Sequence, residues 1–232
     1  MTPDEEAPVG GEPYFAEFPR SRPSPIELRF LYRGELLTFV LDRGIFASRG
    51  LDPGSALLIQ NLGVAPTDRV LDVGCGWGAV GVAAAKSARE GHVVLTDVNR
   101  RAARLARQNL ARNRVRNAEV RVGPLFEPVP GERFDVIATN PPYHIGRAQI
   151  LRLLGEAPAH LAPGGRLLLV GKGSEGIRYY QRWLEEHGPG PVSVLDRGSG
   201  FRVLESRAPG TPRESASAAV PRRAKAARQG SA

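Results

Sequence analysis

Long apolar runs, cysteine pairs and clustered histidines are all missing from this sequence of 232 residues. No stretch of about 18 apolar residues occurs, so we expect no membrane span. The chain starts Met-Thr-Pro-Asp-Glu-Glu, without the basic start and apolar segment of a secretory signal, and we expect a cytoplasmic protein. Cys75 is the only cysteine, which excludes an internal disulfide and a cysteine-based zinc cluster. The scattered histidines predict no metal site; they are His92, His144, His160 and His187.

Basic residues outnumber acidic ones by 32 to 24, for a net charge of +8, which favours a polyanionic partner such as nucleic acid. Composition divides the chain into three parts. Residues 1–25 are acidic and proline-rich with no apolar period, and we expect them to be disordered. Residues 26–207 have enough hydrophobic content for one folded domain. Residues 208–232 are rich in Pro, Ser and Ala and basic, and predict a disordered tail that contacts phosphates or is simply solvated.

The stretch at residues 70–78 reads Val-Leu-Asp-Val-Gly-Cys-Gly-Trp-Gly. Its apolar start predicts a buried strand, and the glycines at 74, 76 and 78 predict a tight turn into a helix from Ala79. A strand, a glycine turn and a helix form the nucleotide-binding end of a doubly wound sheet. Asp72 would repel a pyrophosphate but suits a ligand with ammonium and sulfonium charge. This disfavours a dinucleotide dehydrogenase.

The remaining pattern alternates strands and helices. Residues 92–97 predict a second strand whose terminal Asp97, about 20 residues after the glycine turn, would bind ribose hydroxyls. Residues 100–113 predict an amphipathic helix with a solvated arginine face. We therefore expect an α/β fold, Rossmann-like and doubly wound, with a mostly parallel seven-stranded sheet and an antiparallel C-terminal hairpin. Other expected elements are a strand pair at 27–40, helices at 79–86, 146–161 and 176–187, strands at 118–122, 134–139 and 166–170, and the hairpin at 191–207.

The motif Asn140-Pro141-Pro142-Tyr143 follows directly on the strand at 134–139, at the sheet edge where the glycine turn also lies. Its prolines give rigid carbonyls without competing N–H donors. If the Asn140 side-chain oxygen and the Pro141 carbonyl accept the two N–H groups of a planar amine, the amine lone pair is aimed at a methyl on sulfur. Positioning would then supply most of the catalysis. Tyr143 would stack on the planar group.

These residues resemble the RsmC-type "methyltransferase small" family, a branch of the S-adenosylmethionine (SAM)-dependent amino methyltransferases, over about residues 28–205. The segments that carry the resemblance are residues 38–39, 44–46, 52–55, 70–78, 96–102, 139–142, 171–173 and 200–204. The resemblance implies methylation of guanine N2 in small-subunit ribosomal RNA, SAM as cofactor and RNA as partner, with no metal and no membrane. A base inside a duplex cannot reach such a pocket, so the target is expected in a loop or as a flipped nucleotide.

The resemblance also assigns roles to single residues. Asp72, Gly74 and Gly76 would hold the methionine part of SAM, with Cys75 in the same turn. Asp97 would hold the ribose and Val98 would pack on adenine. The target amine and base, and the transferred methyl, would lie against Asn140, Pro141, Pro142 and Tyr143, with Phe46 lining the same pocket.

This sequence departs from the family pattern in two ways, and its motifs also fit other functions. Pro124 stands where the family usually has a polar side chain for the adenine amine, so this contact would fall to backbone near Leu125. The two-domain members have an additional N-terminal domain, for which we expect no room in this chain. A glutamine-N5 protein methyltransferase shares the Asn-Pro-Pro-Tyr motif, as do adenine-N6 enzymes. A non-catalytic SAM-fold module that binds RNA is disfavoured by the intact Asp72, Asp97 and Asn140.

Overall fold

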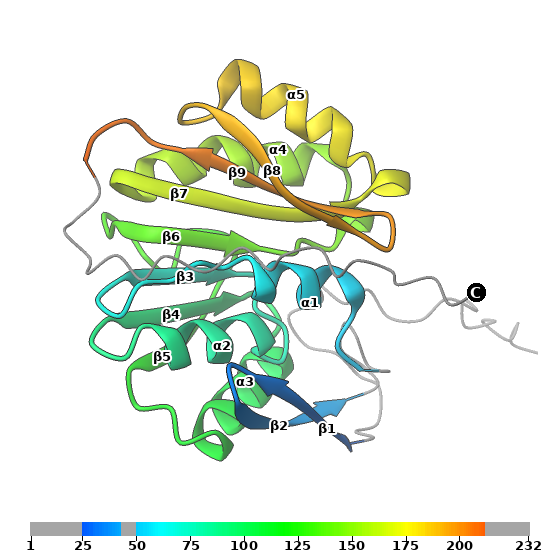
Figure 1. Cartoon of the computed structure of the whole chain (residues 1–232), viewed down its shortest axis with the longest axis vertical. Coiled ribbons are helices and arrows are strands. Elements are labelled where there is room, and N and C mark those ends of the chain that lie inside the picture. Colours follow the sequence, from blue (N-terminus) through cyan, green and yellow to red (C-terminus); the bar gives the residue numbers. More distant parts are fainter. Residues whose placement is uncertain (1–24, 43–49, 212–232) are drawn as a thin grey trace, which may run out of the picture.

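The computed structural model describes residues 25–42 and 50–211. Seven strands form one twisted sheet in the order β5-β4-β3-β6-β7-β9-β8 (Figure 1). Neighbouring strands are parallel from β5 to β7, and β9 runs antiparallel to both β7 and β8. The strands are β3 (Arg69–Val73), β4 (His92–Asp97), β5 (Ala118–Val122), β6 (Phe134–Thr139), β7 (Leu161–Lys172), β8 (Val192–Gly198) and β9 (Phe201–Arg207).

Helices cover both faces of the sheet, as expected for a doubly wound fold. One face packs against α1 (Pro53–Gln60), α2 (Ala79–Ser87) and α3 (Arg100–Arg112), and the other against α4 (Arg147–Glu156) and α5 (Ile177–His187). The central strands are buried on both sides, which explains their near-continuous apolar runs. The predicted fold class is confirmed. No helix in the described ranges is long and apolar enough to cross a bilayer.

Two predicted boundaries need correction. The strand expected at 166–170 begins at Leu161, because the Pro163-Gly164-Gly165 turn is a bulge within β7: Phe134 pairs with Leu161 and Val136 already pairs with Arg166. The helix expected at 146–161 is α-helical only to Glu156 and ends in the 3₁₀ turn η2 (Ala157–His160). Pro158 lacks the N–H that an α-helix needs at that position.

A two-stranded hairpin, β1 (Pro25–Tyr32) and β2 (Glu35–Asp42), packs against α3. The side-chain amides of Asn113, the C-cap of α3, and Asn109, one turn earlier, pair with β2 in the way that a neighbouring strand would. Each accepts from and donates to the backbone of one β2 residue, Thr38 and Val40 respectively, over 2.8–3.0 Å. Asn109 also donates to the Trp77 carbonyl at 2.8 Å. The hairpin is therefore tied through α3 to the glycine turn.

The arginine face of α3 is only partly solvated. Arg101 forms an ion pair with the buried Asp42, through Nε at 2.8 Å among other contacts. Arg107 donates to the Val120 carbonyl at 2.7 Å. The expectation of a solvated face is wrong for Arg101, whose side chain is only 16% exposed; Arg107 is exposed, although it too joins α3 to a neighbouring strand.

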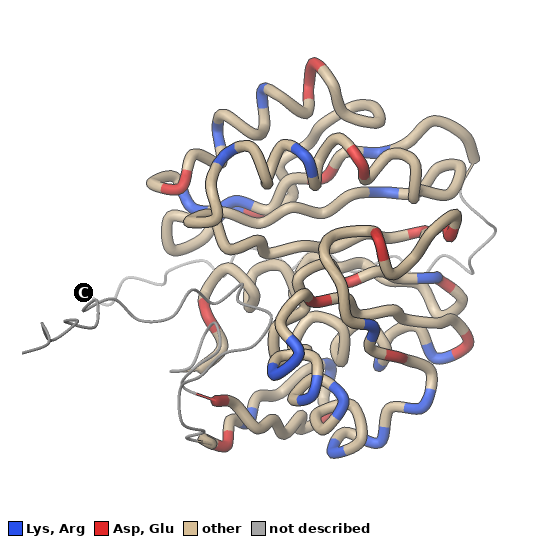
Figure 2. Tube along the Cα trace, turned by 180° about the vertical axis from the view of Figure 1, so that it is seen from behind, with Lys and Arg blue, Asp and Glu red and all other residues tan. Residues whose placement is uncertain are grey.

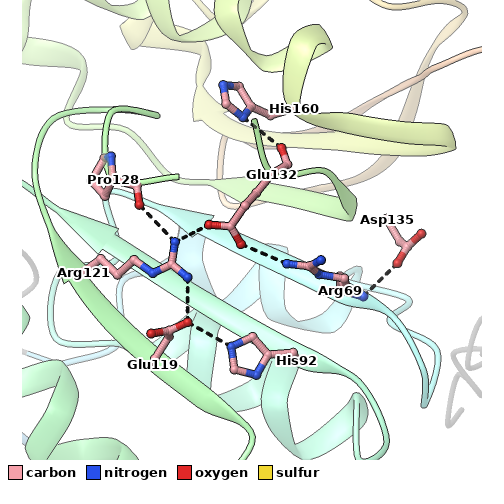
Figure 3. A network of polar contacts seen from close by, with 8 residues as sticks. All are labelled: Arg69, His92, Glu119, Arg121, Pro128, Glu132, Asp135 and His160. Carbon is pink, nitrogen blue, oxygen red and sulfur yellow. Dashed lines mark hydrogen bonds and ion pairs between the residues drawn. The ribbon is translucent and has the colours of Figure 1, made fainter. Parts of the chain in front are cut away.

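A polar network anchors the loop between β5 and β6 (Figure 3). Arg121 donates to the Pro128 carbonyl at 3.0 Å, to Glu119 at 2.8 Å and to Glu132. Glu132 in turn accepts from Arg69 at 2.9 Å, at the start of β3. Both ends of the loop are thereby held, which matters because its first residues form a wall of the main cavity.

Candidate active site

The glycine turn after β3 is held by two backbone hydrogen bonds from Gly74 and Cys75 to the Thr96 carbonyl, each 2.9 Å. Gly74, Gly76 and Gly78 all have positive φ, of 72°, 56° and 89°. A Cβ on Gly78 would lie 3.2 Å from the Ala106 Cβ, so this glycine lets α3 approach. A Cβ on Gly74 would meet no protein atom within 4 Å. Gly74 therefore leaves open space above the turn, where a ligand can approach the backbone.

Asp72 lies under this turn with only 2% of its surface exposed. Its carboxylate accepts from the Gly81 N–H at 2.8 Å. Burial, together with the nearby Asp97 charge, raises the Asp72 pKa to about 7, although the Gly81 hydrogen bond opposes the shift. A cationic group that pairs with this buried carboxyl would stabilise its ionised form.

Asp97 ends β4 and clamps the glycine turn. One carboxylate oxygen accepts from the Gly76 N–H and the other from the Asn99 N–H, both at 2.8 Å. The sequence predicted Asp97 as a ribose ligand but not this second role. Each carboxylate oxygen has more than one lone pair, so ribose binding and the clamp are compatible.

A cavity of about 310 Å³ opens at the carboxyl ends of the parallel strands. Gly74, Asp97 and Val98 form part of its wall, and Pro124 and Leu125 face them from the loop after β5. Leu125 has a positive φ of 48°, unusual for leucine, and its carbonyl accepts from Thr96 Oγ1 at 3.3 Å. The complete lining is Val73, Gly74, Thr96, Asp97, Val98, Gly123, Pro124, Leu125, Thr139, Pro141, Pro142, Ile145, Gln149 and Leu153.

A second hollow, of about 30 Å³, also has Gly74 in its lining. Asp72, Gly76 and Asn140 line it together with Ser55. Cys75 also lines it, and burial raises the pKa of its thiol well above the usual range, so it stays protonated. Gly74 lines both cavities, whereas Asp97 lines only the larger one and Asp72 and Asn140 line only the smaller one.

The side chain of Asn140 has a defined orientation. Its amide nitrogen donates to Ser55 Oγ at 2.9 Å and lies 3.3 and 3.4 Å from the two carboxylate oxygens of Asp52. A carboxylate only accepts hydrogen bonds, so the amide nitrogen must face Asp52 and the Asn140 oxygen must face away. The sequence patterns did not predict this contact between Asn140 and residues 52 and 55.

The side chain of Tyr143, the last residue of the motif, is held against β7. Its hydroxyl donates to the Val170 carbonyl at 2.8 Å, and its ring lies 5.6 Å from that of Tyr180. Burial raises its pKa well above the usual range. Gly171 makes room, because a Cβ there would lie 2.2 Å from the hydroxyl. Base stacking by Tyr143 stays a prediction, and Phe46 lies outside the described residues.

Residues 36–205 match the family model of the methyltransferase small domain. The chain belongs to the methyltransferase small domain family. It is 29% identical over 198 residues to protein YbxB of Bacillus subtilis, covering 84% of this chain and 98% of that protein. It is 34% identical over 193 residues to ribosomal RNA small subunit methyltransferase C of Pseudomonas syringae pv. syringae, covering 82% of this chain and 55% of the relative.

A solved structure shows the same architecture. The Thermus thermophilus 16S rRNA N2 methyltransferase RsmC, in complex with AdoMet and guanosine, superposes with a TM-score of 0.68 at 28% identity. The match covers 79% of this chain and 50% of that one. The chain thus spans about half the length of the RsmC relatives that it matches.

The cofactor of this SAM-dependent methyltransferase is S-adenosylmethionine, and the residues present fit it. The buried Asp72 carboxyl offers a partner to a cationic amino-acid tail, and Gly74, which lines both cavities, leaves open space beside the backbone. The larger cavity, with a carboxylate at Asp97 and apolar walls at Val98 and Leu125, fits a nucleoside. In the described residues the Leu125 N–H has no hydrogen-bond partner, so backbone recognition of adenine remains open to it.

Proposed function

We propose that this protein methylates an exocyclic amine of RNA, with guanine N2 of small-subunit ribosomal RNA as the expected target. The orientation of Asn140 carries the proposal. Its oxygen is directed away from Asp52 while the residue lines the hollow beside Asp72 and Gly74. The guanosine-bound relative and the RsmC sequences support guanine over other amines. The cytoplasm is the expected compartment.

Asn140, Pro141 and Pro142 each have a role in this mechanism. SAM supplies a methyl group made electrophilic by its sulfonium. Asn140 Oδ1 and the Pro141 carbonyl accept the two N–H groups of the target amine and so hold its lone pair in one direction. Pro141 and Pro142 fix that backbone, because their rings restrict φ. As the nitrogen becomes positive, the two oxygens stabilise the charge, and the proton leaves to water.

The charge of α3 supports RNA as the partner. Between Asp97 and Glu119 the sequence has seven arginines and no acidic residue. In Figure 2 basic positions crowd α3 and the loop after it, at the lower end of the molecule. Among the described residues Arg104, Arg114 and Arg116 are exposed and form no ion pair. The helix begins beside the cavity wall at Val98 and runs for about 20 Å, enough to follow several phosphates.

A glutamine-N5 protein methyltransferase is the second candidate, because Asn-Pro-Pro-Tyr also suits a carboxamide. The arginine surface and the RsmC relatives favour RNA over it. A module that binds RNA without catalysis is the third, and it gives no reason for the oriented amide of Asn140.

The test is transfer of labelled methyl from SAM to total RNA, offered naked and as ribosomal particles, with total protein in parallel. We expect label in RNA, and its loss with Asn140→Ala while SAM is still bound. Label only in protein would replace the proposal with the glutamine enzyme. SAM binding without any transfer would point to the non-catalytic module.

A further inference from the structure

We infer that Asp52, the N-cap of α1, and Ser55, in its first turn, position the Asn140 amide for methyl transfer, an inference that rests on the proposed function. The amide nitrogen of Asn140 has two hydrogens. Ser55 Oγ accepts at 2.9 Å, and the Asp52 carboxylate lies within 3.3–3.4 Å. Both hydrogens are therefore directed at α1, and the Asn140 oxygen is left for the target amine.

Asp52 and Ser55 contribute differently to this orientation. The Ser55 hydroxyl can donate as well as accept, so alone it would tolerate either orientation of the amide. The Asp52 carboxylate has no hydrogen to donate, and a flipped Asn140 would place oxygen against oxygen. Asp52 thus determines which side of the Asn140 amide, nitrogen or oxygen, faces α1. Ser55, with the shorter contact, holds the amide nitrogen in place.

Asp52 is itself held in place. It is the N-cap of α1, and its Oδ1 accepts from the Gly54 and Ser55 N–H groups at 2.9 and 3.1 Å. The first turn of α1 also lies close against β9, because a Cβ on Gly54 would be 2.8 Å from the Phe201 ring. The carboxylate therefore has little freedom to move away from Asn140.

The contact has a chemical consequence during transfer. The amine lone pair forms the new nitrogen–carbon bond, and the sulfur–carbon bond breaks with its electrons staying on sulfur. The amine nitrogen is positive until its proton leaves to water. A carboxylate behind the Asn140 amide polarises it, so that the amide oxygen becomes a stronger acceptor as this charge develops. Asp52 acts through Asn140 and is a positioning residue.

Matched variants separate this role from helix capping. Asp52→Asn keeps a good N-cap but replaces the pure acceptor by an amide that also donates. Asp196→Asn is the control, because Asp196 accepts from the Asn61 amide at 3.1 Å at the other end of α1. Ser55→Ala removes the second acceptor and Ser55→Thr restores a hydroxyl. All are compared for kcat, KM for RNA, SAM affinity and melting temperature.

For Asp52→Asn we expect kcat to fall about a hundredfold, the size associated with misplacing a reacting group by about 1 Å. KM for RNA and SAM affinity should change less than about threefold. Ser55→Ala should lower kcat, and Ser55→Thr should restore it toward the wild-type value. Asp196→Asn should have the kcat of the wild type. An unchanged kcat in Asp52→Asn, a loss confined to SAM affinity, or an equal loss in Asp196→Asn would overturn the inference.

A measurement without cofactor or RNA keeps this test independent of the proposed function. The side-chain amide protons of Asn140, assigned in NMR spectra with Asn140→Ala, should exchange slowly in wild type. They should shift and exchange faster in Asp52→Asn but not in Asp196→Asn. Unchanged Asn140 resonances in Asp52→Asn would refute the positioning contact even if RNA methylation is confirmed. Absent methylation in wild type would refute the proposed function instead.

Discussion

Replacing Asp72 by asparagine is expected to make the folded protein more stable above neutral pH and to weaken its binding of SAM. Asp72 is buried beneath the glycine turn, and its pKa is raised from 3.8 to about 7, chiefly by burial. Burying the ionised Asp72 therefore lowers the stability of the folded protein, and a cationic ligand that pairs with the carboxylate would offset this loss. Asparagine has nearly the same shape and stays neutral at every pH.

The sign and size of the effect follow from proton linkage. The unfolded chain loses the Asp72 proton near pH 3.8, whereas the folded protein retains it until about pH 7. Between these values the folded state binds more protons, so its stability falls as pH rises. Each pKa unit corresponds to about 1.4 kcal/mol, so the two units from pH 5 to pH 7 amount to about 3 kcal/mol.

The comparison between variant and wild type isolates this contribution. The asparagine of the Asp72→Asn variant would keep an acceptor for the Gly81 N–H but bury an amide nitrogen without a partner, at a cost of about 1–3 kcal/mol. That cost does not depend on pH. The difference in unfolding free energy, variant minus wild type, should therefore increase by about 3 kcal/mol from pH 5 to pH 8, whatever its absolute value.

Urea unfolding of both cofactor-free proteins at several pH values between 5 and 8 measures this difference. Isothermal titration with SAM at pH 8 should show at least tenfold weaker binding by Asp72→Asn, because the carboxylate partner of the ligand's ammonium is lost. Parallel pH profiles for the two proteins would refute the raised pKa. SAM binding as tight as in wild type would refute the assignment of Asp72 to the cofactor.

Two further variants, one single and one double, test the glycine turn and the basic surface. Gly74→Ala should still fold, because its Cβ would meet no protein atom, although alanine at a φ of 72° should lower the stability by about 1–2 kcal/mol. Titration should show SAM affinity reduced at least tenfold, because the added methyl group would occupy the open space where we expect SAM to approach the turn. Unaltered binding would contradict that placement of SAM. Arg104→Gln with Arg114→Gln should lower the salt dependence of RNA binding, measured by fluorescence anisotropy, by about 1.5–2 in log–log slope. The control variant with Arg178→Gln and Arg182→Gln, on α5, should change this slope little. An equal change of the slope in both variants would argue against a specific role for α3.

Local patterns predicted most of the fold. The apolar run and glycine spacing around Asp72 define a strand, a turn and a helix within one short stretch, and the structure places them as expected. The Asn-Pro-Pro segment likewise follows its strand directly, so parallel topology brings it beside the glycine turn. Both predictions depend on neighbours in sequence, where propensity and periodicity are informative.

Contacts between distant residues could not be predicted in the same way. Asn140 lies 88 residues from Asp52, and no periodicity relates them. Asn109 fits the inward face of an amphipathic helix, yet its polar bonds to β2, 69 residues away, emerge only from packing. The turn of Tyr143 toward β7 depends on the space at Gly171, another long-range feature.

Identification of the methylated nucleoside tests the central claim most directly. Small-subunit particles are incubated with labelled SAM and the protein, their RNA is digested to nucleosides, and the label is assigned by chromatography with mass spectrometry. The account predicts label in N2-methylguanosine, absent with Asn140→Ala. Label in N6-methyladenosine, or in glutamine of a ribosomal protein with none in RNA, would contradict it.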